Sequence, residues 1–268
     1  MRLAPLLFGF VAILLMWGIY GDYSVEIARF FTENPKAGLE VTASWGDSFG
    51  GFNAAVSTIG AGLILYTLHL QQVSVKEQFH DLHRQKFESR FFEMLRLLRE
   101  QRNSLEFSYS SKYFNKKTGS VPNVSKRKVY RSLEAVRHCM AEILYWTRHE
   151  PDPENVSRSR AGELYMTGVF TTAETTFAPY FRSIYIILNK IKRDKILNDE
   201  EKAEYGNLLR GQLTATELYL LAYNSTAPIS KDLGNLIEYF HLFKYMPLNR
   251  VRIRIGRYFS SRAFQART

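Results

Sequence analysis

Two long stretches without a charged residue constrain this chain more than any other feature of its sequence. Residues 3–20 and residues 48–75 contain no Asp, Glu, Lys or Arg, although charged residues make up 23% of the 268 residues. A helix of about 20 apolar residues is long enough to cross the hydrocarbon core of a bilayer. The sequence therefore predicts two membrane spans, at about residues 3–20 and 50–69, joined by a loop at 21–49.

The charges around the two spans predict their orientation. The loop at 21–49 carries five acidic residues against two basic ones, whereas residues 70–268 carry 33 basic residues against 21 acidic ones. Because basic flanks remain on the cytoplasmic side, we expect the loop outside and both termini in the cytoplasm. A cleaved signal peptide is the competing interpretation of residues 3–20, but the sequence GIYGDYS that follows the apolar run offers a poor cleavage site.

The second span has two different faces when its residues are placed on a helix. One face is apolar, with Phe52, Val56, Ile59, Leu63 and Tyr66 at steps of four and three. The other face is small and polar, and it consists of Gly50, Asn53, Ala54, Ser57, Gly60 and Ala61. Small and polar residues in a membrane helix favour contact with another helix. That helix is either the first span or the same span of another copy, in which case Asn53 and Ser57 would line a path for water.

Beyond the second span the pattern of apolar residues predicts helices. No Gly or Pro interrupts residues 66–107, so we expect the second span to continue into a helical stalk at 71–108. Residues 110–125 predict a polar loop, and residues 126–148 and 181–191 predict amphipathic helices. Two capping pairs predict helix starts, Asn198 with Glu201 and Thr214 with Glu217.

The expected fold class is therefore all-α. A transmembrane helical hairpin occupies residues 1–70, the stalk residues 71–108, and a cytoplasmic helical domain residues 109–268. Ser230 predicts the start of a helix that runs to Met246, before Pro247. The sequence RVRIRI, from residue 250 to residue 255, is the one stretch that is ambiguous between strand and helix.

Motifs for cofactor-dependent chemistry are missing from the sequence. It contains no nucleotide-binding glycine motif and no nucleophile elbow, and its single cysteine, Cys139, excludes a disulfide within the chain. His80 and His83 lie on one face of the predicted stalk, but such a pair on a charged helix is more often a solvated surface than a metal site. We expect neither a cofactor nor a bound metal.

One pair of residues permits an enzymatic alternative. Six residues separate Arg131 from His138 on the predicted helix at 126–148, a spacing compatible with the Arg–His pair of HEPN ribonucleases. In such a site the pair would polarise a phosphodiester and transfer a proton. The basic C-terminal segment that starts at Arg250 is expected to bind anionic lipid, and direct binding of nucleic acid is not expected.

Five blocks of the sequence, in this order, resemble the phage abortive infection (AbiC-like) proteins of bacteria. They are WGDSFGGFNAAVSTIGAGLILYTLHLQ, FFEMLRLLREQRNSL, YFRSIYIILNKI, LLRGQLTATELYLLAYNS and LIEYFHLFKYMP, between Trp45 and Met246. The resemblance implies a two-span protein of the bacterial inner membrane that acts in antiphage defence. It brings no catalytic residues, but it implies regulatory or ligand-binding candidates: Arg182, Arg210, Gln212, Glu217, Tyr223 and Asn224.

The sequence thus predicts an abortive-infection effector that needs no enzymatic chemistry. When triggered, it would oligomerise in the lipid bilayer and permeabilise or depolarise the inner membrane. We expect a phage- or host-derived trigger or a silencing protein as its partner, and a reverse transcriptase with its RNA is one candidate. The alternatives are a membrane-anchored HEPN-like ribonuclease toxin, which would use Arg131 and His138, and a non-toxic membrane receptor or scaffold.

Overall fold

The structure is a computed structural model, and it describes residues 39–265 together with residues 15, 19, 23, 26, 29 and 30. The predicted first span, except Leu15 and Ile19, and about half of the predicted outer loop therefore lie outside the described residues, whereas residues 39–49 of that loop are the start of a long helix. The chain divides into two compact units, residues 1–78 and residues 79–268.

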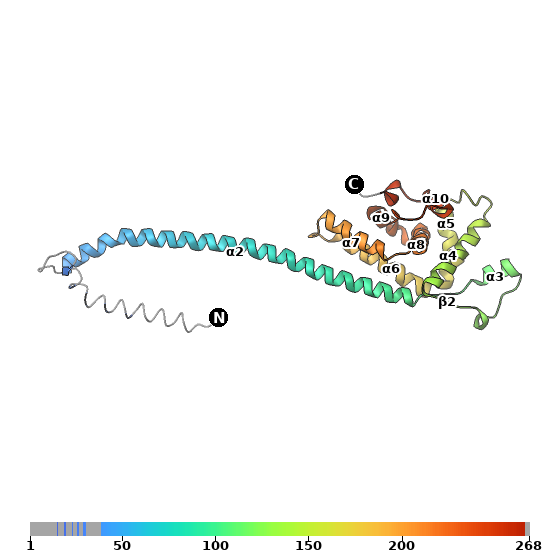
Figure 1. The fold of residues 1–268 in the computed structure, drawn as a ribbon, viewed down its shortest axis with the longest axis horizontal. Coiled ribbons are helices and arrows are strands. Elements are labelled where there is room, and N and C mark those ends of the chain that lie inside the picture. The colour runs from blue at the N-terminus through green and yellow to red at the C-terminus, as the bar shows by residue number, and fades with distance from the viewer. Residues whose placement is uncertain are drawn as a thin grey trace. The chain divides into compact units, whose positions relative to one another are not determined.

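The described part of the chain is helical apart from one short β-pair, so the expected all-α class is confirmed (Figure 1). The first helix is α2, Leu39–Asn103. It is followed by β1 (Glu106–Phe107), α3 (Ser111–Thr118), η1 (Val124–Lys126), β2 (Tyr130–Arg131), α4 (Ser132–Arg148), α5 (Arg158–Tyr165), the π-helix η2 (Met166–Phe170), α6 (Thr171–Arg193), α7 (Asp199–Gly211), α8 (Ala215–Thr226), η3 (Pro228–Ser230), α9 (Lys231–Tyr239), α10 (Arg250–Ile255) and η4 (Ser261–Phe264).

The predicted uninterrupted helix after the second span is confirmed by α2, although α2 ends at Asn103 and not at Phe107. In the second unit, one stripe of α2 is buried, and it consists of Phe87, Phe91, Leu95 and Leu98. Phe87 and Phe91 both lie against Tyr205 of α7, with ring centroids 4.9 and 4.8 Å apart. Much of the expected stalk is therefore part of the core of the second unit.

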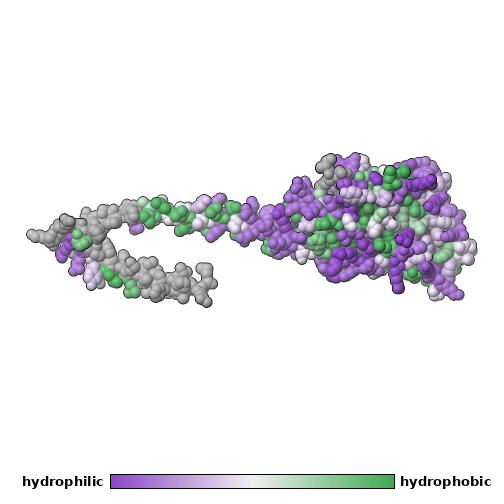
Figure 2. Space-filling model, viewed as in Figure 1, coloured by the Kyte–Doolittle hydropathy of each residue, from purple (hydrophilic) through white to green (hydrophobic). Residues whose placement is uncertain are grey.

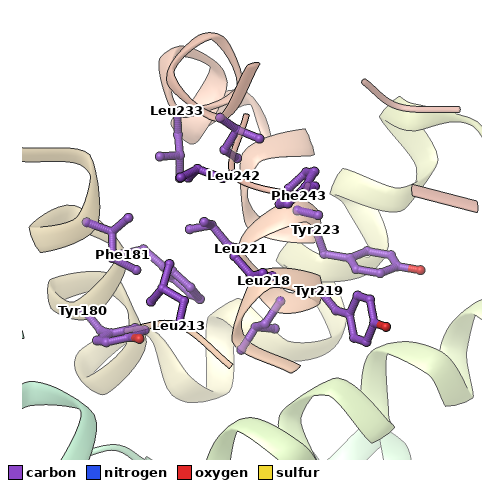
Figure 3. Packing of buried hydrophobic residues seen from close by; sticks show 14 of the residues in the cluster. Tyr180, Phe181, Leu213, Leu218, Tyr219, Leu221, Tyr223, Leu233, Leu242 and Phe243 are labelled. Atoms are coloured by element: carbon purple, nitrogen blue, oxygen red, sulfur yellow. The ribbon is translucent and has the colours of Figure 1, made fainter. Parts of the chain in front are cut away.

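Helix α8 is the centre of the second unit. Nine of its 12 residues are buried, and it contacts α4, α5, α9 and α10. A helix that is apolar on all sides has to be surrounded by other elements, because any exposed side would leave apolar surface in water. Figure 3 shows how Leu218 and Leu221 of α8 pack among Phe181 of α6, Leu233 of α9 and the following Leu242 and Phe243.

Both predicted capping pairs are confirmed. The side chain of Asn198 accepts from the amide of Glu201, and the Glu201 carboxylate accepts from the amide of Asn198. Thr214 and Glu217 form the same reciprocal pair at the start of α8. Each pair satisfies amides that would otherwise lack a partner in the first turn of its helix.

Local helix limits differ from the predictions in three further places. The predicted loop at 110–125 contains α3, which Ser110 caps by accepting from the amide of Tyr113. The helix predicted from residue 126 begins at Ser132, because Tyr130 and Arg131 pair with β1 instead. The helix predicted from Ser230 to Met246 ends at Tyr239, since His241 has a φ of 51° and turns the chain so that Leu242 and Phe243 enter the core.

The arginine-rich C-terminal segment is folded onto the second unit, and RVRIRI is the helix α10. Asn249 caps this helix by accepting from the amide of Arg252. Arg252 and Arg257 donate to the backbone carbonyls of Met246 and Glu154. These two arginines thus fasten the C-terminal segment to the rest of the second unit. The sequence predicted lipid binding for this segment and did not predict these contacts.

Candidate functional site

The six polar residues singled out in the sequence occupy different places in the second unit. Glu217 and the backbone of Gln212 belong to a buried ion-pair network, Arg210 lies at the end of α7, and Tyr223 is enclosed in the core. Arg182 and Asn224 line one cavity. That cavity is the candidate functional site, because the other four residues are used in contacts that hold helices together or are inaccessible.

Glu217 is the centre of the ion-pair network. Its carboxylate accepts from Nε of Arg102 at 2.7 Å and from the hydroxyl of Tyr180. Arg102 also donates to the carbonyl of Gln212. Glu217 is 1% exposed, and the network joins the last turn of α2 to α6 and α8. Each of these groups has a hydrogen-bond partner, so the network serves to fasten helices.

Arg210 and Tyr223 have structural surroundings as well. Nη1 of Arg210 donates to the carbonyl of His241 at 3.2 Å, and its guanidinium lies 4.9 Å from the centroid of the Tyr245 ring. Burial lowers the pKa of Arg210, whereas Tyr245 raises it by a smaller amount. The side chain of Tyr223 is fully buried, and its hydroxyl has no hydrogen-bond partner among the described residues.

The candidate site is a cavity of about 480 Å³ between α6 and α9, within the range typical of sites for small ligands or peptide segments. Helix α6 contributes one face at helical spacing: Glu174, Ala178, Phe181, Arg182 and Tyr185. The remaining walls are Phe170 of the π-helix η2, Asn224 of α8, and Ile229, Ser230, Asp232 and Leu233 from η3 and α9. A π-helix is rare and is frequently found at functional sites.

Asn224 is the most informative residue of the cavity. It is 2% exposed, and its Nδ2 donates to the hydroxyl of Tyr165 at 2.9 Å. Its Oδ1 has no hydrogen-bond partner among the described residues. A buried polar atom without a partner is costly, so Oδ1 of Asn224 calls for a partner that the described residues do not supply, such as a water molecule or a ligand in the cavity.

The charged residues of the cavity are not neutralised by one another. Arg182, Glu174 and Asp232 form no ion pair with any described residue. A second cavity of about 380 Å³ adjoins the first, since both are lined by Tyr185 and Asp232. The second cavity adds Lys192 and Arg193 of α6. The two cavities together offer separate positive and negative groups to a ligand.

Glu174, Tyr185 and Asp232 are site residues that the sequence reasoning missed. The sequence does indicate the contribution of α6, since Glu174, Ala178 and Arg182 follow one another at steps of four residues and therefore share a helical face. Asp232 could not have been found in this way. It reaches the site only because α9 packs against α6.

The two residues of the enzymatic alternative have other partners in the structure. Arg131 lies in β2 and donates to the carboxylate of Glu106 at 2.9 Å. His138 lies in α4, its ring stacks on Tyr130 with a centroid distance of 3.4 Å, and its Nδ1 is 2.9 Å from the Tyr109 hydroxyl. Burial lowers the pKa of His138, although Glu134 opposes this effect. Both side chains therefore have structural roles beside the β-pair.

The small, polar face of the predicted second span lies in the first unit, on α2. The described members Asn53, Ala54, Ser57 and Ala61 are exposed, and a Cβ added at Gly50 or Gly60 would meet nothing within 4 Å. The hydroxyl of Thr58 donates to the carbonyl of Ala54 at 2.8 Å, which satisfies it within the helix. No described residue covers this face of the segment.

Two further observations concern metals and membranes. Among the described residues, no group of three or more His, Cys, Asp or Glu residues is placed to hold a metal ion. His83 of the HDLH sequence instead lies 3.0 Å from the carboxylate of Asp194.

The described part of the chain contains one helix that is long and apolar enough to cross a membrane, namely the part of α2 from Asn53 onwards. None of its apolar stretch is buried (Figure 2).

Comparison with protein families gives one match. The model of the family described as "putative phage abortive infection protein" matches residues 172–251. This range contains α6 to α9 and every residue named above for the cavity except Phe170. No curated protein and no solved structure matches the chain. Over residues 172–251, the chain is therefore similar to the phage abortive infection proteins.

Proposed function

We propose that this protein is a membrane-anchored effector of abortive infection that oligomerises when triggered and permeabilises or depolarises the inner membrane. The family match supports a role in defence against phage. The observation that carries the membrane part is the apolar stretch of α2, none of which is buried. A stretch of this length and composition is stable in a bilayer and would be unfavourable in water.

In this proposal the protein crosses the membrane twice. The apolar residues 3–20 form the first span, α2 supplies the second from about residue 50 to residue 69, and the acidic loop between them faces outwards. The second unit then lies in the cytoplasm, where its cavity binds a phage- or host-derived trigger or a silencing protein. A reverse transcriptase with its RNA is one such partner.

Self-association of the second span is the proposed route to membrane damage. Gly50 and Gly60 would let two helix backbones approach closely, and Asn53 and Ser57 would form hydrogen bonds between copies. Each such bond contributes about 0.6–2 kcal/mol in a membrane. Several copies arranged in this way would place polar side chains around a shared axis and allow ions to pass.

Single-cell imaging of membrane potential after phage challenge tests this mechanism. The wild-type protein should depolarise the membrane before the cells die. The double variant Asn53→Leu, Ser57→Leu should still insert but should no longer depolarise the membrane. The matched control Ile59→Leu, Leu63→Ile changes the opposite, apolar face and should behave as the wild type does. Cell death without prior depolarisation, or full toxicity of the first variant, would contradict the proposal.

The two alternatives give different results in the same cells. If the protein is a ribonuclease, His138→Ala abolishes toxicity while membrane insertion is unchanged. If it is a receptor or scaffold, deletion of residues 1–70 displaces a partner from the membrane and no variant is toxic.

A further inference from the structure

The two cavities beside α6 adjoin one another, and together they are longer than a small-molecule site; we call the two together the groove. They share Tyr185 and Asp232, and along α6 they extend from Glu174 to Lys192. At a rise of 1.5 Å per residue, these 18 helical steps correspond to about 27 Å. An extended polypeptide rises about 3.3 Å per residue, so about eight residues would fill this length.

The charges of the groove have an order along it. Glu174 provides a negative charge at one end, and Lys192 and Arg193 provide positive charges at the other end. Arg182 and Asp232, of opposite sign, line the part between them. None of these residues forms an ion pair with another described residue. The ammonium of Lys192 lies 4.9 Å from the centroid of the Tyr239 ring, and the charges of the other four residues are available to a ligand.

The floor of the groove is apolar and contains one unsatisfied hydrogen-bonding atom. Phe181 of α6 and Leu233 of α9 are buried beneath it, and Figure 3 shows both side chains in the core. Asn224 leaves its Oδ1 without a partner among the described residues, while its Nδ2 is held by Tyr165. Rotation of the amide by 180° would only exchange the atom that lacks a partner. A backbone amide or carbonyl of a bound peptide would satisfy either atom.

Other ligand classes fit these observations less well. A polyanion such as RNA would meet the carboxylates of Glu174 and Asp232, which repel phosphate. A lipid chain would remove water from Arg182 and both carboxylates without replacing their hydrogen bonds. A mononucleotide would suit the aromatic residues and Arg182, but it would occupy only one of the two cavities.

We propose that this groove binds an extended segment, about eight residues long, of a partner protein. The segment carries Lys or Arg where it passes Glu174 and Asp or Glu where it passes Lys192 and Arg193. Its apolar side chains lie on Phe181 and Leu233, and its backbone bonds to Asn224. This inference deepens the proposed function, because it states the chemistry of the trigger or silencing protein. Binding can be measured without any membrane damage, so the two proposals can fail separately.

Selection from a random eight-residue peptide library tests the inference with the full chain in detergent micelles. The selected peptides should carry a basic residue near one end and an acidic residue near the other end. In fluorescence anisotropy, Glu174→Lys and Arg193→Glu should each weaken binding at least tenfold. Both substitutions change exposed side chains, and circular dichroism would verify that the fold is retained. Glu204→Lys on α7 makes the same charge change as Glu174→Lys outside the groove and should leave binding unchanged.

A charge exchange provides the decisive comparison. A peptide whose basic residue is replaced by Glu should bind Glu174→Lys better than it binds the wild type. The proposal is wrong if no peptide is selected, if the selected peptides show no charge order, or if they bind the two groove variants as well as the wild type. It is also wrong if AMP, GMP, CMP or UMP displaces the selected peptides, because the site would then be a nucleotide site.

Discussion

Removal of the Glu217 carboxylate should destabilise the second unit more than any surface substitution. In Glu217→Leu, Arg102 loses its 2.7 Å ion pair and Tyr180 loses the acceptor of its hydroxyl. The amide and hydroxyl of Thr214, which donate to the same carboxylate at 2.7 and 2.8 Å, lose their acceptor too. Breaking a buried ion pair on one side costs about 3–5 kcal/mol, because the remaining charge of Arg102 is left with only the carbonyl of Gln212 as acceptor.

This loss can be converted into a melting temperature. For a domain of about 150–250 residues, 1 kcal/mol shifts the Tm by about 2–4 °C. We therefore expect Glu217→Leu to lower the Tm by about 6–20 °C, measured by circular dichroism on the full chain in detergent. In the double variant Arg102→Leu, Glu217→Leu, no unpaired charge remains, so its Tm should lie above that of Glu217→Leu alone.

Two results would refute this reasoning. The first is a Tm of Glu217→Leu within about 2 °C of the wild type. The second is a double variant whose loss of Tm equals the sum of the losses of Glu217→Leu and Arg102→Leu measured separately. The two substitutions would then act independently, and the two residues would not be coupled.

Further expectations concern pH, glycine and helix capping. Burial raises the pKa of Glu142, although hydrogen bonds from Ser110 and Trp146 oppose this effect, so the folded state binds a proton more tightly than the unfolded state does. Ionisation of Glu142 therefore lowers the free energy of unfolding, and this loss is complete above the folded-state pKa. In denaturant titrations, the free energy of unfolding should recover as the pH falls from the folded-state pKa towards the unfolded-state pKa. Gly162→Ala would place a Cβ 2.6 Å from the carbonyl oxygen of Thr226, and in the same titrations it should lower the free energy of unfolding by about 1–3 kcal/mol. The control Gly211→Ala places a Cβ with nothing within 4 Å and should not destabilise the protein. Asn198→Ala removes the cap of α7 and should cost about 1 kcal/mol, and an unchanged denaturation midpoint would contradict this expectation.

The sequence was a good guide wherever a signal lies within one helix. Of the predicted apolar stripe in residues 181–191, Phe181, Ile184, Leu188 and Ile191 are buried as their spacing predicts, whereas Tyr185 is only partly buried and lines both cavities. The capping pairs are also local, since each connects residues three positions apart. Arg182 and Asn224, by contrast, were candidates because of the family resemblance and not because of a local pattern.

Contacts between distant segments were not predictable in this way. Arg102 and Glu217 are 115 residues apart, and no local pattern connects them. The start of α4 was misplaced because β2 pairs with β1, whose residues lie about 25 positions earlier. The sequence RVRIRI has the alternation of a strand, yet it is a helix that Asn249 caps and the core accommodates.

The sequence by itself determined the two charge-free stretches, the all-helical class and the positions of the main caps, because hydrophobic periodicity and capping act over a few residues. Only the tertiary structure decided that α6 and α9 lie together with cavities between them and that Asn224, whose Oδ1 lacks a partner among the described residues, lines one of them. The physical reason is that a binding site is made by side chains from several elements. Their proximity follows from how the whole core packs, which no single segment encodes.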